Sequence, residues 1–225
     1  MFVVSGHVAA QSSIIVPKNK YKVAVITTKK MLDQTINLDS NKQMISLSKL
    51  IPDIAVELVY ASTNNFTHQA LYPPKTNDTY LWLPTAKALQ KAQAKLSAKG
   101  YGLKIFDAYR PYSVTEKFWQ LIHDERYVAN PAKASGHNKG AAVDLTIIDL
   151  MTKKALDMGT GFDNFTDSAH HTFTGLPPQV LANRKLLKKT MIKYGFKPLE
   201  TEWWHYSWPG NFEALDLSFN DLVRQ

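Results

Sequence analysis

Residues 135–148 read SGHNKGAAVDLTII, a glycine-flanked turn that runs into a stretch of alternating side chains. From position 141 to 148 the side chains follow the two-residue period of a β-strand packed on a core. One face of this strand carries Val143, Leu145 and Ile147. The other face carries Asp144, and a carboxylate on a buried strand is costly unless it is paired or bound to a cation. The stretch therefore predicts a strand with an ion pair or a cation site on it.

A histidine in the preceding turn lies close enough to share such a site. His137 stands between Gly136 and Gly140, and these glycines allow the backbone to fold back toward the strand. The imidazole and the Asp144 carboxylate can then close on the same ion.

Three helices are predicted in the surrounding sequence. The first covers residues 85–99, with Thr85 as its N-cap and Gly100 as its stop. The second begins at the capping box Ser113–Glu116, and the third covers residues 179–194. Their inward faces are predicted to carry Leu89, Ala92 and Leu96 in the first helix, Val114, Phe118, Leu121 and Ile122 in the second, and Leu187, Met191 and Tyr194 in the third.

Two further strands are predicted, over residues 54–60 and 103–106, and residues 64–78 are predicted to form a long loop. Strands and helices mix without a regular βαβ alternation, which favours the α+β class. We therefore expect one domain over residues 45–225, with a small, mostly antiparallel sheet flanked by helices and the metal site on the sheet. Residues 1–44 are expected to be an N-terminal extension. For residues 1–13 two interpretations stay open, the remnant of a signal peptide and a frayed terminus.

The composition excludes several classes of protein. The chain has 225 residues and no cysteine, which rules out disulfide frameworks, thiolate metal sites and a thiol nucleophile. No run approaches the roughly 18 apolar residues of a membrane span. Lys and Arg outnumber Asp and Glu by 27 to 19, for a net charge of +8. The basic group at residues 184–193 is interpreted as the solvated face of the third helix, and with no nucleic-acid-binding motif present we expect no nucleic-acid partner.

A second segment, Glu202-Trp203-Trp204-His205, also carries ligand types. In a helix Glu202 and His205 share a face, whereas in a regular strand they oppose each other, so a bend is needed if the segment is extended. Two histidines and one carboxylate leave a tetrahedral zinc with one open position, and a nearby glutamate that is not a ligand can act as general base. This interpretation requires two distant segments to meet. The indoles are interpreted as core.

A rigidly placed arginine is the third candidate. Arg110 follows a predicted buried strand and precedes a proline turn. Its guanidinium can stabilise an oxyanion or form a structural ion pair with Asp107, and the sequence leaves both alternatives open.

Together these motifs resemble one known family. Ser135-x-His137-x-x-Gly140-x-Ala142-x-Asp144, the downstream Glu202-Trp203-Trp204-His205 and the upstream Asp107-Ala108-Tyr109-Arg110-Pro111 are similar to motifs of the zinc-dependent D-alanyl-D-alanine dipeptidases of the VanX type. These enzymes are related to DD-carboxypeptidases and to hedgehog-type zinc domains. Matching runs at residues 58–61, 65–67 and 158–163 extend the resemblance over about Ile45 to Ser207.

The resemblance implies a role for each matching residue. One Zn²⁺ per chain is expected on His137, Asp144 and His205, with Glu202 as catalytic base and Arg110 stabilising the transition state. Asp163 is expected to hold the substrate's ammonium group, and Ser135 and Tyr60 to lie near its carboxylate. His170 and His171 match a histidine pair that does not bind zinc. The chain departs from the pattern at Gly136 and Asn138, where bulkier polar or basic residues are expected.

The resemblance implies hydrolysis of a small D,D-dipeptide, D-alanyl-D-alanine, to D-alanine. One alternative is a peptidoglycan DD-carboxypeptidase or endopeptidase with the same chemistry. The other is a non-catalytic zinc-stabilised binding module, against which the joint presence of Glu202 and Arg110 argues. Both the bacterial cytoplasm and the periplasm are compatible with the sequence, which also leaves the oligomeric state and the biological role open.

Overall fold

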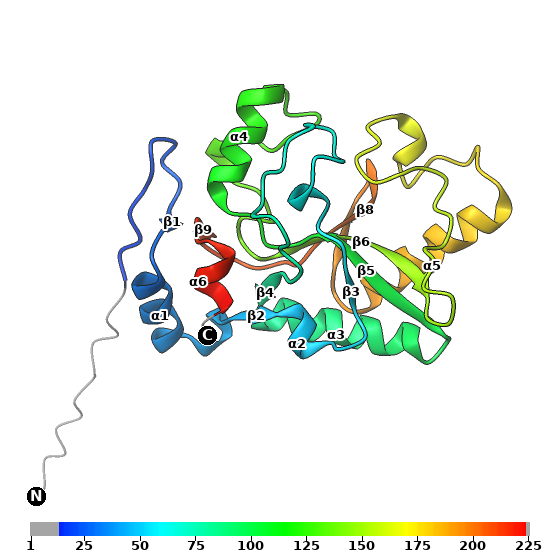
Figure 1. Ribbon diagram of the computed structural model, residues 1–225, viewed down its shortest axis with the longest axis horizontal. Helices are drawn as coiled ribbons and strands as arrows, with labels where there is room; N and C mark the ends of the chain where they lie inside the picture. The colour runs from blue at the N-terminus through cyan, green and yellow to red at the C-terminus, as the bar shows by residue number, and fades with distance from the viewer. Residues whose placement is uncertain (1–13, 224–225) are drawn as a thin grey trace, which may run out of the picture.

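A five-stranded sheet forms the centre of the computed structural model, which describes residues 14–223 (Figure 1). The strand order is β3-β5-β6-β8-β7, and only the β3–β5 pair is parallel. These strands are β3 (Ala55–Val56), β5 (Tyr101–Asp107), β6 (Ala142–Asp149), β7 (Lys197–Leu199) and β8 (Glu202–Ser207). Helices flank this mostly antiparallel sheet, so the predicted α+β class is confirmed.

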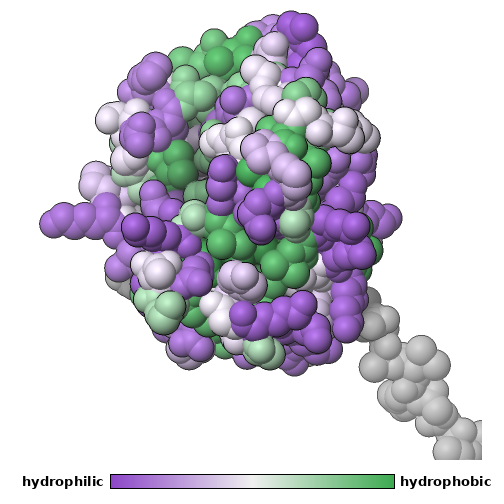
Figure 2. All heavy atoms as spheres, turned by 90° about the vertical axis from the view of Figure 1, so that its right-hand side faces the viewer, coloured by the Kyte–Doolittle hydropathy of each residue, from purple (hydrophilic) through white to green (hydrophobic). Residues whose placement is uncertain are grey.

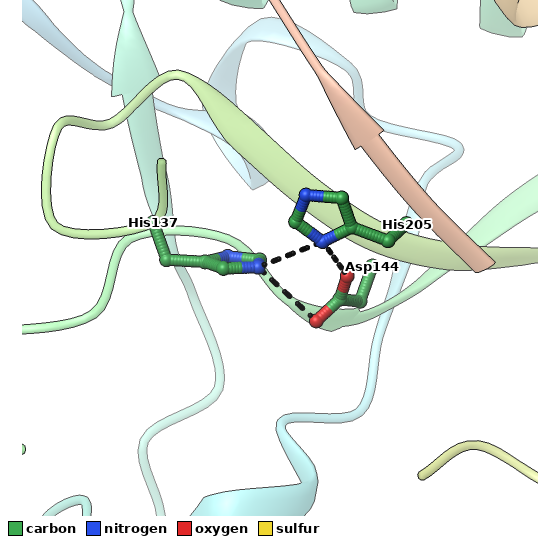
Figure 3. A group of neighbouring side chains, drawn as sticks. All are labelled: His137, Asp144 and His205. Carbon is green, nitrogen blue, oxygen red and sulfur yellow. Dashed lines mark hydrogen bonds and ion pairs between the residues drawn. The ribbon is translucent and has the colours of Figure 1, made fainter. Parts of the chain in front are cut away.

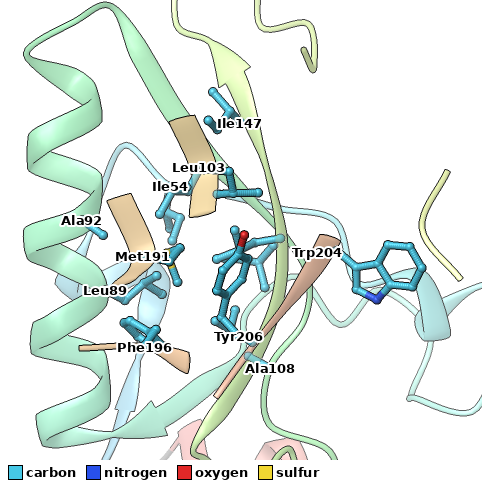
Figure 4. Close-up of a cluster of buried hydrophobic side chains, with 14 of the residues drawn as sticks. Ile54, Leu89, Ala92, Leu103, Ala108, Ile147, Met191, Phe196, Trp204 and Tyr206 are labelled. Atoms are coloured by element: carbon cyan, nitrogen blue, oxygen red, sulfur yellow. The ribbon is translucent and has the colours of Figure 1, made fainter. Parts of the chain in front are cut away.

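Two long helices cover one face of the sheet. They are α3 (Leu83–Ser97) and α5 (Pro178–Lys193), close to the predicted ranges. Leu89 of α3 and Leu187 of α5 are fully buried against the alternate apolar side chains of β6. In Figure 4 α3 lies on one side of the strands while Trp204 projects from the other side. The functional side chains described below use that second side.

The second face is covered by α4 (Tyr112–Ile122), the short 3₁₀ helix η2 (Val59–Ala61) and long loops. Tyr60, Phe118 and Phe66 pack there through edge-on and tilted ring contacts. The predicted loop over residues 64–78 is observed, with no helix or strand in it. The second face thus carries a cluster of aromatic side chains.

Residues on the N-terminal side of the predicted domain also pack onto the body. β1 (Val25–Ile26) pairs in parallel with β9 (Ala214–Leu215), and Leu32 of α1 (Lys29–Leu38) is fully buried. The interpretation of residues 1–13 concerns a segment outside the described residues, and the domain boundary at residue 45 stays a prediction. The remaining elements are η1 (Ser40–Lys42), β2 (Met44–Ser46), α2 (Leu47–Leu50), β4 (Tyr80–Trp82), η3 (Pro131–Lys133), η4 (Asp167–Ala169) and α6 (Phe219–Val223).

The predicted N-caps of two helices are wrong. α3 begins two residues before Thr85, and that side chain is buried inside the first turn, where Pro84 is tolerated. α4 begins at Tyr112, so Ser113 is already helical, and its hydroxyl donates to Asp216 instead of capping. At α4 a tertiary contact therefore outweighed the local capping signal.

Three other expectations also need correction. The strand predicted over residues 54–60 is reduced to β3, because the chain turns into η2 and buries Tyr60. Leu121 of α4 is 46% exposed rather than inward. Arg184 was assigned to the solvated face, yet it is buried and donates to the backbone carbonyls of Met158 and His170.

The outside of the molecule agrees with a basic, hydrophilic sequence. Seen from the right-hand side of Figure 1, hydrophilic residues form most of the outline, and hydrophobic ones gather toward the centre (Figure 2). Among the described helices, none has both the length and the apolar character that crossing a membrane requires.

Candidate metal centre

Three side chains from two distant segments converge on one point. His137, Asp144 and His205 each offer a ligand atom, and these atoms all lie within 4.8 Å of one another (Figure 3). The Nε2 atom of His137 lies 3.2 Å from Oδ2 of Asp144 and 3.3 Å from Nδ1 of His205. The Nδ1 atom of His205 lies 2.8 Å from Oδ1 of Asp144. Two imidazoles and one carboxylate form a donor set that suits a divalent transition metal, so the residues fit the implied zinc.

The turn before β6 aims His137 at this point. The Nδ1–H of His137 donates to the backbone carbonyl of Ala108 at 2.8 Å, which leaves the lone pair of Nε2 directed inward. Gly136 allows the turn to lie against β6, since a Cβ at this position would stand 2.8 Å from the Cβ of Ala142. Gly140 has φ +53°, a conformation that other residues rarely adopt. The close approach leaves no room for a larger side chain at Gly136 in this chain.

A local irregularity of β8 places Glu202, Trp204 and His205 on one side. Asp144 and His205 are direct partners across the β6–β8 ladder. On the other edge Pro198 pairs with Tyr206 but Leu199 pairs with Glu202, so β8 has extra residues there. Glu202, Trp204 and His205 consequently all line one cavity. This is the bend that the Glu-x-x-His spacing required.

The cavity has a volume of about 540 Å³ and brings the predicted residues together. All eight site residues predicted from the sequence line it: Tyr60, Arg110, Ser135, His137, Asp144, Asp163, Glu202 and His205. The hydroxyl of Tyr60 donates to Asp163 at 2.9 Å, and Ser135 accepts from the backbone N–H of His137 at 3.2 Å. His137, Asp144 and His205 therefore lie in the wall of a cavity that is also lined by Glu202, Arg110 and Asp163.

Arg110 forms the ion pair with Asp107 that was one of the two alternatives, and its role toward an oxyanion stays a prediction. Its Nε and Nη2 atoms donate to Oδ2 of Asp107 at 3.0 and 2.6 Å, and the side chain still lines the cavity. Asp107 is fully buried and also accepts from the hydroxyl of Tyr72 at 2.6 Å. The guanidinium stacks over the Phe118 ring, 4.6 Å from its centroid. Such a clamp holds the positive charge in a fixed orientation.

Asn138 is a residue whose importance the sequence analysis missed. It is fully buried, and its Oδ1 accepts from the backbone N–H of Ser135. Its Nδ2 donates to the carbonyl of Arg110 at 3.0 Å and to the hydroxyl of Thr115 at 2.9 Å. It thereby ties the turn of His137 to the loop of Arg110. Its departure from the family pattern was the one signal that marked it.

Burial and mutual charge set the ionisation of the acids. Burial raises the pKa of Glu202 above its ordinary value, and the charge of Asp144 adds to this, although His205 opposes it. Burial and the Asp144 charge likewise raise the pKa of Asp163 well above its ordinary value. Burial also acts to raise the pKa of Asp144, but His137 and His205 outweigh it and hold that pKa below its ordinary value. The pKa values of Asp144 and Glu202 are thus shifted in opposite directions, and such divergent shifts are typical of functional sites.

The two other candidate histidines lie outside the centre. His171 packs against Tyr206, and burial lowers its pKa to about 4. His170 makes a long contact of 3.9 Å with Asp167. Within residues 14–223 the group of His137, Asp144 and His205 is the one cluster of three or more potential ligands. The prediction that the His170–His171 pair stays outside the metal site agrees with this arrangement.

Sequence comparisons agree with the geometry. The pattern of the D-ala-D-ala dipeptidase family matches residues 40–223. A D-alanyl-D-alanine dipeptidase of Escherichia coli is 35% identical over 172 residues, which are 76% of this chain and 88% of the relative. Those of Enterococcus faecalis and Streptomyces coelicolor are 32% and 30% identical, over 71% and 72% of this chain and 88% and 89% of the relatives. This chain therefore belongs to the D-ala-D-ala dipeptidase family of peptidases.

Proposed function

We propose that this protein hydrolyses the D-alanyl-D-alanine dipeptide to D-alanine, with one Zn²⁺ held by His137, Asp144 and His205. The observation that carries the proposal is the three-ligand cluster, which shares one cavity with Glu202 and Arg110 in a chain of this family. When bound, zinc supplies a Lewis acid that polarises the scissile carbonyl and lowers the pKa of a water molecule.

Glu202 is the general base in this proposal. Its carboxylate takes a proton from the attacking water and returns it to the nitrogen of the leaving D-alanine. A raised pKa suits this task, because a more basic carboxylate accepts the proton more readily and is still able to release it. The neighbouring Trp204 is buried and lines the same cavity.

Arg110 stabilises the negative charge that develops on the carbonyl oxygen. Its guanidinium is fixed by Asp107 and by the Phe118 ring, so little reorganisation is needed as the charge appears. The ion pair does not consume all of its five N–H donors, and the remaining ones are free to face the substrate.

Asp163 selects a free amino end. Its carboxylate lines the cavity, and the ammonium group of a dipeptide restores its charge by pairing with it. This selection favours a dipeptide over a longer peptide. Ser135 is proposed to lie near the substrate carboxylate. Tyr60 is also predicted to lie near the substrate carboxylate, and in the free protein its hydroxyl donates to Asp163.

The test is release of D-alanine from D-alanyl-D-alanine by zinc-loaded protein, with Glu202→Gln as the variant. We expect activity to fall about a thousandfold while the zinc content measured by atomic absorption stays at one per chain. Chelation should abolish activity, and zinc should restore it. Undiminished hydrolysis by Glu202→Gln would refute the role of Glu202.

A second measurement separates the dipeptidase from the carboxypeptidase alternative. Free D-alanyl-D-alanine is compared with a pentapeptide that ends in the same pair, in wild type and in Asp163→Asn. We expect the wild type to prefer the dipeptide and Asp163→Asn to lose that preference, mainly through KM. Faster cleavage of the pentapeptide by wild type would favour the carboxypeptidase instead.

A further inference from the structure

Two lysine rows lie on the helices that cover the far face of the sheet. On α3 and just beyond its end the row is Lys87, Lys91, Lys95 and Lys99, and on α5 it is Lys185, Lys189 and Lys193. Successive members are four residues apart, so each row follows one side of its helix with a spacing of about 6 Å. All seven side chains are exposed. Neither residues 83–99 nor residues 178–193 contain an Asp or a Glu.

These lysines have no acidic partners among residues 14–223. No ion pair within 4 Å involves any of the seven, whereas Lys188, which lies beside the α5 row, pairs with Glu200. Like charges four residues apart destabilise a helix. The protein therefore carries an arrangement that is unfavourable for its own folding, and a bound polyanion would remove the repulsion.

The two rows border a groove between α3 and α5. Its volume is about 190 Å³, and it is lined by Lys95, Lys99, Lys189 and Lys193, with Leu96, Leu186 and Thr190 as the other lining residues. Four lysines thus line one groove with no acidic residue in its lining. The sheet separates this groove from the metal centre, because α3 and α5 pack on the opposite face from Trp204.

We propose that this groove binds a linear, flexible polyanion whose backbone carries phosphodiester groups and no bases. A single polymer chain matches a groove between two packed helices, whose axes lie about 8–10 Å apart, whereas a DNA duplex is too wide to enter it. None of the lining side chains is aromatic, so the groove offers no platform on which bases stack. A flat membrane surface would leave the concave part of the site unfilled. The binding goes beyond the peptidase activity and does not depend on it.

Salt dependence measures the number of lysine contacts. Binding of end-labelled poly(glycerol phosphate) to the full chain is followed by fluorescence anisotropy at several salt concentrations. With four contacts and a slope of about 0.7 per contact, a fourfold rise in salt from 50 to 200 mM weakens binding roughly 50-fold. In Lys95→Gln with Lys189→Gln two contacts remain, and the same rise in salt weakens binding only about sevenfold.

A matched control removes the same net charge elsewhere. Lys18→Gln with Lys30→Gln changes two exposed lysines that lie outside the groove and have no ion pair among the described residues. In this variant the same rise in salt should weaken binding roughly 50-fold, as in the wild type. Both double variants should hydrolyse D-alanyl-D-alanine at the wild-type rate, so a lost peptidase activity and a lost polymer site are distinguished.

Three outcomes would overturn the proposal. The first is no measurable binding of poly(glycerol phosphate) at low salt. The second is equal slopes for the groove variant and its control, which would mean that only net charge matters. The third is binding confined to phosphatidylglycerol vesicles or to duplex DNA, which would assign the lysines to a different class of partner.

Discussion

Replacing Asn138 with alanine tests how the two functional loops are held together. Asn138→Ala removes three short hydrogen bonds and leaves the N–H of Ser135, the carbonyl of Arg110 and the hydroxyl of Thr115 without this partner. Each such group costs about 1–3 kcal/mol when it is buried and unsatisfied. We therefore expect the free energy of unfolding to fall by about 3 kcal/mol. For a chain of this size that is a decrease in Tm of roughly 6–12 °C.

The same change should weaken the metal site. The tie between Ser135 and Arg110 passes through Asn138, and His137 lies within that turn. Loss of a supporting hydrogen bond around a metal ligand typically lowers metal affinity 10–100-fold. Thermal unfolding of the metal-free protein gives the stability, and competition with a zinc chelator gives the affinity.

A double-mutant cycle isolates the tie from a general loss of packing. Thr115→Val keeps the shape of the Thr115 side chain and removes only its hydroxyl. Since Asn138 and Thr115 share one hydrogen bond, Asn138→Ala should cost less in the Thr115→Val background than in wild type. If Asn138→Ala melted within 2 °C of wild type and bound zinc equally well, the reasoning about this network would be wrong.

Three further predictions follow from particular contacts. Burial raises the pKa of Glu202, and a general base must be ionised, so kcat/KM should fall as the pH drops through a pKa above the ordinary value of 4.5. This acid limb of the pH profile should vanish in Glu202→Gln. A limb that persists in the variant would assign it to another group. Lys91→Glu turns two repulsive pairs of the α3 row into attractive ones, so the free energy of unfolding measured by chemical denaturation should rise by about 1 kcal/mol. A fall in that free energy would contradict the like-charge argument. Gly136→Ala should destabilise the protein by about 1–3 kcal/mol, because the added Cβ meets that of Ala142 at 2.8 Å. Adding Ala142→Gly to this variant should restore much of the lost stability. A second substitution that restores nothing would point to backbone strain instead.

Much of the metal centre could be predicted from the sequence because its signals are local. The alternation along β6 identified Asp144 as a polar residue on a buried strand, and the glycine-flanked turn identified His137 as its neighbour. Both inferences depend on residues within about ten positions of each other. The motif order then made the family recognisable, and the matches to relatives confirm that membership.

The helix starts show where local signals fail. Thr85 and Ser113 both have the side chains of good N-caps, and neither caps its helix. Ser113 instead meets Asp216, a residue more than a hundred positions away in the chain. A capping hydrogen bond contributes about 1 kcal/mol, which a distant partner of similar strength can offset.

By itself the sequence determined the α+β class and the position of the long helices, because periodicity and turn chemistry are set by near neighbours in the chain, and the family resemblance of its motifs predicted the residues of the candidate metal site. Only the tertiary structure decided that Glu202 and His205 share one side of β8, because that depends on the register between β7 and β8. It also decided that Arg184 is buried while the lysines beside it stay exposed around a groove, since burial depends on which distant carbonyls and helices lie alongside. Register and burial are properties of contacts between distant segments, and no pattern within one segment specifies them.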